Sequence, residues 1–477
     1  MNSMEAQRKN REVHLRALCI TLVIGAVIWF IPSPVDLQEK AWHLFAIFVA
    51  TIVGFIIKPL PMGGVAILSI TAVVLTGTLK LEEALSGFQN TTIWLIVIAF
   101  FISRGFIKTG LGNRIAYMFV KLFGRKTLGL SYSLLVSDLI LSPAMPSNTA
   151  RGGGIIFPIA HSLSRTFGSD PENGTEKKVG SFLMQVAFQG VNITSAMFMT
   201  AMAANPLAAT LAHNAGVTIT WTDWALAAIV PGLASLIVVP YFIYKVYPPE
   251  IKETPAASEI ATEKLKEMGP LKKSEWSMIM VYLLILALWI FGGKLGIDAT
   301  TTALIGLSVL LLTSVLTWND VKKEEGAWDT LVWFASLVMM ATFLNSLGMI
   351  PWFSHLMGTA VHGLPWIWAL IALALIFFYS HYFFASNTAH VSAMYAAFLG
   401  VAIAAGAPPM LAALLLGFIG NLFGCLTHYG SGPAPVFFGS GYVPQDKWWL
   451  LGFSVSVIHL IIWGVIGGLW WKVLGIW

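Results

Sequence analysis

Long apolar runs separated by short polar segments make up most of the 477-residue chain. A helix that crosses a bilayer needs roughly 20 mainly apolar residues. Eleven runs approach or exceed that length and are predicted to be membrane-spanning segments, the fifth of them long enough for two helices. They cover residues 17–31, 41–57, 62–79, 91–107, 179–216, 224–245, 276–297, 302–317, 328–346, 409–438 and 448–471.

Two further apolar stretches, about 128–164 and 364–404, do not fit as simple spans. The first lies between cationic flanks, Arg125-Lys126 and Arg165, and its middle is rich in proline and glycine. Proline and glycine clusters end helices, so each arm has about 14 residues, or about 21 Å, which is shorter than a bilayer core of about 30 Å. The stretch therefore predicts a re-entrant hairpin that enters from the cytoplasm and returns.

The second stretch has no Lys or Arg on either flank and predicts a hairpin that enters from outside. With the N-terminus in the cytoplasm, this topology puts 23 of the 28 Lys and Arg residues inside and 4 outside, with Arg151 at membrane depth. Such an asymmetry is typical of cytoplasmic loops. A multi-pass protein of the plasma membrane with an extracellular C-terminus is expected.

Composition supports this class and excludes others. Hydrophobic residues are 57% of the chain and charged residues 11%, against about 25% in soluble domains. A soluble enzyme, a disordered chain and a nucleic-acid binder are excluded, and the net charge of +5 is explained by basic cytoplasmic loops. Neither a cofactor nor a metal is expected.

The polar stretch around 246–275 divides the chain into two halves. It follows a cytoplasmic N-terminus (1–16) and a first half (17–245), and it precedes a second half (276–477). We interpret it as a cytoplasmic linker.

The two halves share a motif in the same surroundings. Ser-Asn-Thr occurs at 147–149 and again at 386–388, in the middle of each hairpin. After each hairpin comes a long segment that is broken at mid-depth, at 200–206 and at 427–435. Because one hairpin opens inward and the other outward, the repeats are inverted, and inverted repeats with broken helices are typical of secondary transporters.

The two tips and the two breaks define a candidate binding site. A Ser or Asn at such a tip can simply cap the next helix, and this alternative remains open. The free N–H groups of a helix start also favour an anion, so two facing tips would hold an anion with two negative ends. The candidate substrate-binding residues are Ser147, Asn148, Thr149, Ser386, Asn387, Thr388, Thr200, Pro206, Thr427 and Gly432.

Three basic side chains are candidates for charge compensation. Arg151 and His390 each follow their Ser-Asn-Thr-Ala motif directly, and His428 lies in the second break. An arginine at membrane depth is functional by default, but Arg151 could instead be paired with Asp138, the only carboxylate well inside an apolar segment. His390 and His428 could equally be interior histidines whose hydrogen bonds are satisfied, and His381 is a weaker candidate.

With its two Ser-Asn-Thr tips, the chain resembles the divalent anion–sodium symporter (INDY-type) family over essentially its whole length. Residues 146–154 are most similar to the 2-oxoglutarate/malate translocators of bacteria and plastids, so a bacterial dicarboxylate exchanger is expected. The resemblance implies an all-α protein of about 11 transmembrane helices with two re-entrant hairpins. It also implies a homodimer whose transport domains move as elevators and carry di- and tricarboxylates.

The breaks depart from the pattern of the sodium-coupled members. They contain Asn205-Pro206 and Gly432-Pro433, and cationic side chains lie near where sodium would be needed. A dianion in a low-dielectric site needs compensating charge, which side chains could supply instead of sodium. Sodium-independent exchange of C4/C5 dicarboxylates (2-oxoglutarate, malate, succinate, fumarate) is therefore the hypothesis. A sodium- or proton-coupled symporter of the same fold is the main alternative, and a channel or a histidine-metal enzyme is less favoured.

Overall fold

The computed structural model describes residues 13–360 and 365–477, and all of their side chains except those of 354, 355 and 357–360. The described part is helical, and no β-strand occurs in it beyond one isolated bridge between Lys126 and Glu253. The predicted all-helical class is confirmed. Residues 1–12 of the expected N-terminal segment, and residue 364 at the start of the second expected hairpin, lie outside the described residues.

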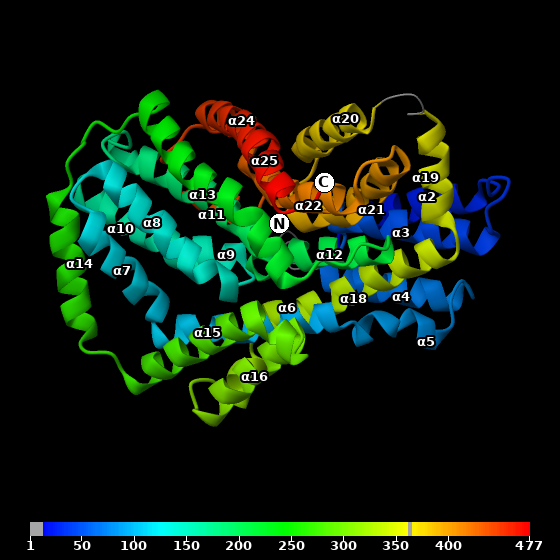
Figure 1. Cartoon of the computed structure of the whole chain (residues 1–477), viewed down its shortest axis with the longest axis horizontal. Helices are drawn as coiled ribbons and strands as arrows, with labels where there is room; N and C mark the ends of the chain where they lie inside the picture. The colour runs from blue at the N-terminus through cyan, green and yellow to red at the C-terminus, as the bar shows by residue number, and fades with distance from the viewer. Residues whose placement is uncertain (1–12, 361–364) are drawn as a thin grey trace, which may run out of the picture.

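The chain begins with a run of helices, of which α2 to α5 lie on one flank of the molecule and α6 lies near its centre (Figure 1). Asn90 caps the last of them, because its side-chain oxygen accepts hydrogen bonds from the N–H groups of Thr92 and Ile93. The helices are α2 (Leu15–Phe30), α3 (Glu39–Ile57), α4 (Met62–Leu75), α5 (Leu81–Ala84), the 3-10 turn η1 (Ser86–Gln89) and α6 (Thr91–Thr109).

The rest of the first half contains the first hairpin and the first broken helix. The π-helical turn η3 follows the tip at the three glycines 152–154. The elements are α7 (Leu111–Phe123), α8 (Thr127–Leu141), η2 (Ser142–Ala144), α9 (Asn148–Arg151), η3 (Gly152–Ile156), α10 (Phe157–Thr166), η4 (Pro171–Asn173), α11 (Gly180–Met197), η5 (Met199–Ala201), α12 (Ala204–Asn214) and α13 (Trp221–Val246).

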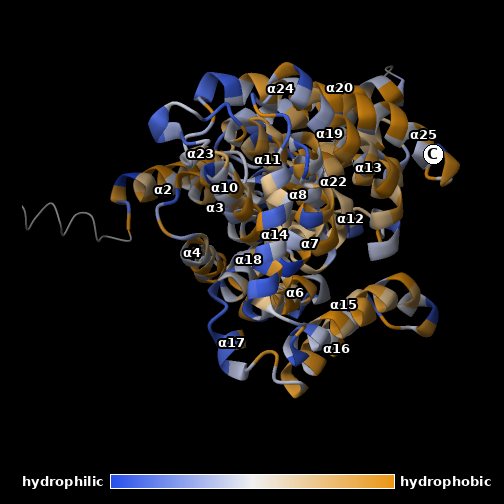
Figure 2. Cartoon of the chain, turned by 90° about the vertical axis from the view of Figure 1, so that its left-hand side faces the viewer, coloured by the Kyte–Doolittle hydropathy of each residue, from blue (hydrophilic) through white to orange (hydrophobic). Residues whose placement is uncertain are grey.

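A polar helix and a pair of apolar helices join the halves. In Figure 2 the apolar pair α15 and α16 extends away from the rest of the molecule, while α14 and α17 are mainly hydrophilic. These elements are α14 (Pro255–Met268), α15 (Lys273–Phe291), η6 (Gly292–Leu295), α16 (Ala299–Leu312) and α17 (Trp318–Lys322).

The second half repeats the order of helix, short helix, hairpin and broken helix. Its second hairpin arm, α21, has 18 residues. The elements are α18 (Glu325–Ser346), α19 (Met349–Ala360), α20 (Trp366–Tyr379), η7 (Ser380–Phe383), α21 (Asn387–Ala404), α22 (Pro409–Leu422), η8 (Phe423–Cys425), α23 (Ala434–Gly439), α24 (Gln445–Ile461), η9 (Ile462–Gly467) and α25 (Gly468–Val473).

Within the described residues, nine helical segments are long and apolar enough to cross a membrane. Three of the nine are the hairpin arms 127–144, 366–383 and 387–404, and four further apolar helices are shorter. The lengths of the helices thus support a multi-pass membrane protein. They do not determine how many of the helices cross the membrane. Eleven spans, re-entrant hairpins and the inverted repeat therefore stay predictions.

The two broken helices pack against each other at the centre of the molecule. Figure 1 shows α12 and α22 side by side there, and α21 lies against both of them. The helix α11 is buried along its entire length. The core therefore surrounds both broken helices.

Replacing Asp320 by asparagine should lower the free energy of unfolding by about 1 kcal/mol at neutral pH. Asp320 accepts a hydrogen bond of 2.6 Å from Lys108 and closes a capping box with Thr317, and these bonds hold the pKa of its carboxyl well below the ordinary value. A lowered pKa stabilises the fold above pH ~4, and the contribution is lost as pH falls further. Denaturant unfolding of both proteins at pH 7 and pH 3 should show a smaller difference at pH 3 than at pH 7.

Candidate functional site

The first Ser-Asn-Thr motif forms the tip of the first hairpin, as expected. Ser147 caps α9, since its hydroxyl accepts a hydrogen bond of 3.1 Å from the N–H of Ala150. The side chain of Asn148 is buried, whereas Thr149 is exposed at the tip. The amide nitrogen of Asn148 points to the sulfur of Met202, just after η5, at 3.7 Å. The tip therefore lies against the first break.

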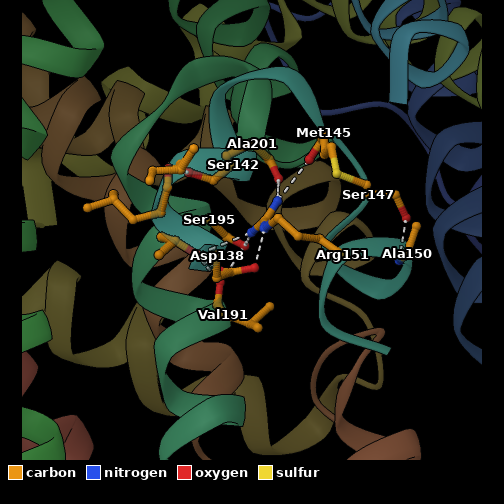
Figure 3. Close-up of polar contacts among 12 residues, drawn as sticks. Asp138, Ser142, Met145, Ser147, Ala150, Arg151, Val191, Ser195 and Ala201 are labelled. Atoms are coloured by element: carbon orange, nitrogen blue, oxygen red, sulfur yellow. Dashed lines mark hydrogen bonds and ion pairs between the residues drawn. The ribbon is translucent and has the colours of Figure 1, made fainter. Parts of the chain in front are cut away.

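Behind this tip, the guanidinium group of Arg151 is fully buried and all five of its N–H groups are hydrogen-bonded (Figure 3). The Nε–H donates to Asp138 at 2.7 Å, which forms an ion pair between two fully buried groups. The other acceptors are the carbonyls of Met145 (2.8 Å) and Ala201 (3.0 Å) and the hydroxyls of Thr194 (3.2 Å) and Ser195 (2.9 Å).

This network decides what Arg151 can do chemically. With every N–H group in use, the guanidinium has no donor left for a ligand. Asp138 balances its charge, so the ion pair that the sequence left open as an alternative is present. Arg151 instead joins the tip, through Met145, to the first break, through Ala201.

The second motif forms an equivalent tip. Ser386 caps α21 by accepting a hydrogen bond from the N–H of Ala389, although at 3.4 Å. Asn387 is buried, and its amide nitrogen donates to the carbonyls of Gly420 (3.1 Å) and Asn421 (3.3 Å) at the end of α22. Thr388 is half-buried beside it. The second tip therefore lies against the second broken helix.

The tips and breaks of the two halves also contact each other. A Cβ atom on Gly432 would lie 2.0 Å from the hydroxyl of Thr149 and 3.5 Å from the side-chain oxygen of Asn148, so the second break reaches the first tip. Asn421 donates a buried hydrogen bond of 2.6 Å to Asn205 in the first broken helix. Residues of both halves thus meet at the candidate site, where Thr149 and Gly432 are exposed.

The other expected residues of the breaks lie deeper. The buried hydroxyl of Thr200 donates to the carbonyl of Pro143 and accepts a hydrogen bond of 3.0 Å from the indole of Trp221, so it supports the tip from behind. Pro206 was expected in the break but lies in the first turn of α12, where a proline needs no N–H partner. The hydroxyl of Thr427 is buried in the second break without a partner among the described residues.

The two candidate histidines differ in their surroundings. His390 is fully buried behind the second tip, and its Nδ1 lies 3.0 Å from Nδ1 of His381. His428 accepts a hydrogen bond of 3.0 Å from the indole of Trp449 and stacks near Phe438. Among the contacts of the described residues, none links His428 to either tip.

Sequence reasoning missed several polar residues next to the tips. A Cβ atom on Gly424 would lie 2.7 Å from the side-chain oxygen of Asn192 and 3.0 Å from the amide nitrogen of Asn387. Around this point, four side-chain oxygens are buried without a partner in the described part of the chain. They belong to Asn192, Asn387, Asn421 and Ser431. Gln185, Gln189 and Asn192 are polar residues within an apolar run. Their spacing of four and three positions puts them on one face of a helix, and this pattern could have indicated a polar site.

A cavity of about 780 Å³ leads to the first break. Its walls are α12 on one side and the ends of α6, α15 and α16 on the other, and Met199 and Trp221 line it beside Thr200. Asp298 also lines it, and hydrogen bonds from Thr301 and Thr300 hold the pKa of its carboxyl below the ordinary value. The cavity is wide enough for a small organic anion.

Replacing Trp221 by phenylalanine should lower the free energy of unfolding by about 1 kcal/mol. The change removes the hydrogen bond to Thr200 but keeps an aromatic ring between Phe198 and Trp289, which both stack on Trp221. Thermal unfolding of the purified variants would measure the loss. Trp276→Phe is a suitable control, because Trp276 is 53% exposed; an equal loss in both variants would contradict a role for the hydrogen bond.

Comparison with known proteins agrees with this architecture. The family described as the sodium:sulfate symporter transmembrane region matches residues 12–477. The chain is 70% identical to YflS of Bacillus subtilis (strain 168), a proposed malate transporter, over all of both chains. It is 55% identical to dicarboxylate transporter 1 of Spinacia oleracea chloroplasts, covering 97% of this chain and 82% of that one.

A solved structure, the YdaH transporter of Alcanivorax borkumensis, shares the fold with a TM-score of 0.56 at 13% identity and 97% coverage of both chains. Family and fold together exclude the enzyme alternative. The chain is an integral membrane transporter that belongs to the sodium:sulfate symporter family, also called the divalent anion:sodium symporter family.

Proposed function

We propose that this chain is a sodium-independent antiporter that exchanges C4/C5 dicarboxylates such as 2-oxoglutarate, malate, succinate and fumarate. The observation that carries the proposal is the meeting of two capped helix starts with two broken helices in one site. Relatives named as malate and dicarboxylate transporters support the substrate class.

In this proposal each tip binds one carboxylate. The N–H groups at the start of α9 and of α21 favour negative charge. Thr149 and Thr388 would donate their hydroxyls, and Asn148 and Asn387 hold the tips in place. Gly432 lets the second break contact the first tip, so the substrate lies beside this contact, within reach of the exposed hydroxyl of Thr149.

Sodium independence rests on the surroundings of Arg151. Its guanidinium already bonds two carbonyls, two hydroxyls and a carboxylate, which are oxygen ligands of the kind that a hard cation would take. The guanidinium group of Arg151 thus occupies the oxygen ligands that a sodium ion would need at this position. Because Asp138 neutralises it, net positive potential at the site comes from the helix starts.

The large cavity supports movement of one part of the chain against another. It lies between α12 and the ends of α6, α15 and α16, where a moving transport domain would meet a fixed scaffold. We propose an elevator movement within a homodimer in the plasma membrane. The N-terminus would be cytoplasmic and the C-terminus extracellular.

A sodium-coupled symporter is the second candidate. The four unpartnered oxygens of Asn192, Asn387, Asn421 and Ser431 favour it, because oxygen atoms are the ligands that hard cations take. The same oxygens could instead accept hydrogen bonds from a hydroxyl of the substrate.

Sodium titration separates the two candidates. Uptake of labelled malate into malate-loaded proteoliposomes should be unchanged between sodium-free choline buffer and sodium buffer of equal ionic strength. Excess succinate or 2-oxoglutarate should compete, whereas acetate should not. Uptake that requires sodium would contradict the antiporter and support the symporter.

A further inference from the structure

Two buried histidines connect the second hairpin to the second break. Nε2 of His381 lies 2.7 Å from the carbonyl oxygen of Gly430, and Nδ1 of His381 lies 3.0 Å from Nδ1 of His390. Nε2 of His390 lies 3.2 Å from the hydroxyl of Ser380. A Cβ atom at Gly430 would lie 2.9 Å from Nε2 of His381, so glycine permits this close approach.

The hydrogen bonds determine where the protons are when both rings are neutral. The carbonyl of Gly430 can only accept, so Nε2 of His381 carries a proton and its Nδ1 does not. Nδ1 of His390 must then donate to His381. Nε2 of His390 is consequently an acceptor for the hydroxyl of Ser380. Only one arrangement of protons satisfies all three contacts.

The same contacts accommodate one additional proton. If Nε2 of His390 is protonated, it donates to the oxygen of Ser380, whose hydroxyl can turn to the carbonyl of Phe377 at 3.2 Å. No hydrogen bond of the pair is lost. A second additional proton would place hydrogens on both Nδ1 atoms and break the bond between the rings, so the pair can hold one extra charge.

Aromatic rings surround the pair. Phe384 lies 4.2 Å from the ring of His390 in a parallel stack, and Phe423 stacks on both histidines at 3.9 Å and 4.5 Å. Aromatic faces stabilise a cation by cation–π attraction.

No carboxylate or permanently charged side chain is among the recorded contacts of the pair in the described residues. The titratable groups of the elements packed against it are neutral at pH 7 in their ordinary states. On η7, η8 and the second break they are Tyr382, Cys425, His428 and Tyr429. Burial without a counter-charge opposes an added proton, whereas a dianion at the neighbouring tip would favour it.

The two halves thus make equivalent connections with different chemistry. Arg151 and His390 occupy the same position after their motifs, and each links its tip to its break. Arg151 reaches Ala201 directly and is neutralised by Asp138. His390 reaches Gly430 through His381 and has no such partner. The second connection is therefore the one whose charge can change.

We propose that His381 and His390 form a binding site for a single proton, which the protein takes up when a dicarboxylate binds at the tips. The inference rests on the proposed dicarboxylate function. It adds His381 to the site, as the residue that positions the second break against the second tip. It also assigns the changing positive charge to the histidine pair.

Calorimetric titration of the purified full chain with malate in two buffers of different ionisation enthalpy would test this directly. At pH 7.5 to 8.5 malate is fully ionised, so the buffer-dependent heat counts protons taken up by the protein. We expect about one proton per malate, and a dissociation constant that rises about tenfold per pH unit.

One variant keeps the hydrogen bond to His381 but removes the nitrogen that takes the additional proton. In His390→Asn the amide nitrogen replaces Nδ1–H, and no equivalent of Nε2 is present. This variant should bind malate with proton uptake reduced to about zero and with little dependence on pH. His459→Leu is the matched control, because His459 is buried with no partner among the described residues and lines a separate apolar cavity. It should keep the uptake of one proton.

The outcomes separate this inference from the proposed function. Malate binding without proton uptake by the unmodified protein would overturn the proton site and leave dicarboxylate binding intact. Full proton uptake in His390→Asn would assign the proton to another group and overturn it as well. If no dicarboxylate binds at any pH, the proposed function fails together with it.

Discussion

Replacing Arg151 by alanine is expected to abolish dicarboxylate exchange and to lower the free energy of unfolding by about 3–5 kcal/mol. The loss leaves the carboxylate of Asp138 buried, with 1% of its surface exposed, and without its cation. It also disconnects the carbonyls of Met145 and Ala201, so the first tip is no longer tied to the first break. Thermal unfolding and proteoliposome exchange would measure the two effects.

A double variant separates stability from transport. Arg151→Met combined with Asp138→Leu removes both charges together, so most of the lost stability should return. Exchange should stay absent, because neither side chain can bond the two carbonyls. Full exchange by the Arg151→Ala variant, or by the double variant, would show that this connection is not needed.

Replacing Gly432 by alanine should raise the KM for dicarboxylate roughly tenfold while leaving the free energy of unfolding nearly unchanged. A Cβ atom at this position would lie 2.0 Å from the hydroxyl of Thr149, so that side chain must rotate away from the site. Both residues are exposed, and the rotation therefore disturbs little of the core. Initial rates of exchange over a range of substrate concentrations would measure KM.

The matched control is Gly439→Ala in α23. A Cβ atom on Gly439 would meet nothing within 4 Å, so this variant should have the KM of the unmodified protein. An unchanged KM in Gly432→Ala would contradict the placement of the substrate beside the contact of the first tip with the second break. An equal change in both variants would contradict it too, because Gly439 has no contact with the first tip.

Local sequence signals predicted most of the helices and both tips. Apolar runs of sufficient length predict helices wherever they occur, and a serine before a new helix favours a cap, as Ser147 and Ser386 show. A stretch rich in glycine and proline predicted the second break, and Asn205-Pro206 predicted the first, although Pro206 lies just inside its helix. These features depend only on neighbours along the chain.

The contacts that complete the site depend on residues distant in sequence. Asn205 and Asn421 are separated by 216 positions, and no periodicity pairs them. Arg151 was recognised as unusual and Asp138 as its possible partner, but only the structure shows that all five N–H groups are used. The pairing of His381 with His390 follows from how the 3-10 turn η7 meets α21.

Uptake of labelled 2-oxoglutarate into proteoliposomes, with and without internal malate and in sodium-free buffer, would decide whether the chain is an antiporter. We expect rapid uptake only when malate is present inside, because each site that carries 2-oxoglutarate inward must return loaded with malate. Uptake that is independent of internal malate, or that appears only after external sodium is added, would contradict the antiporter.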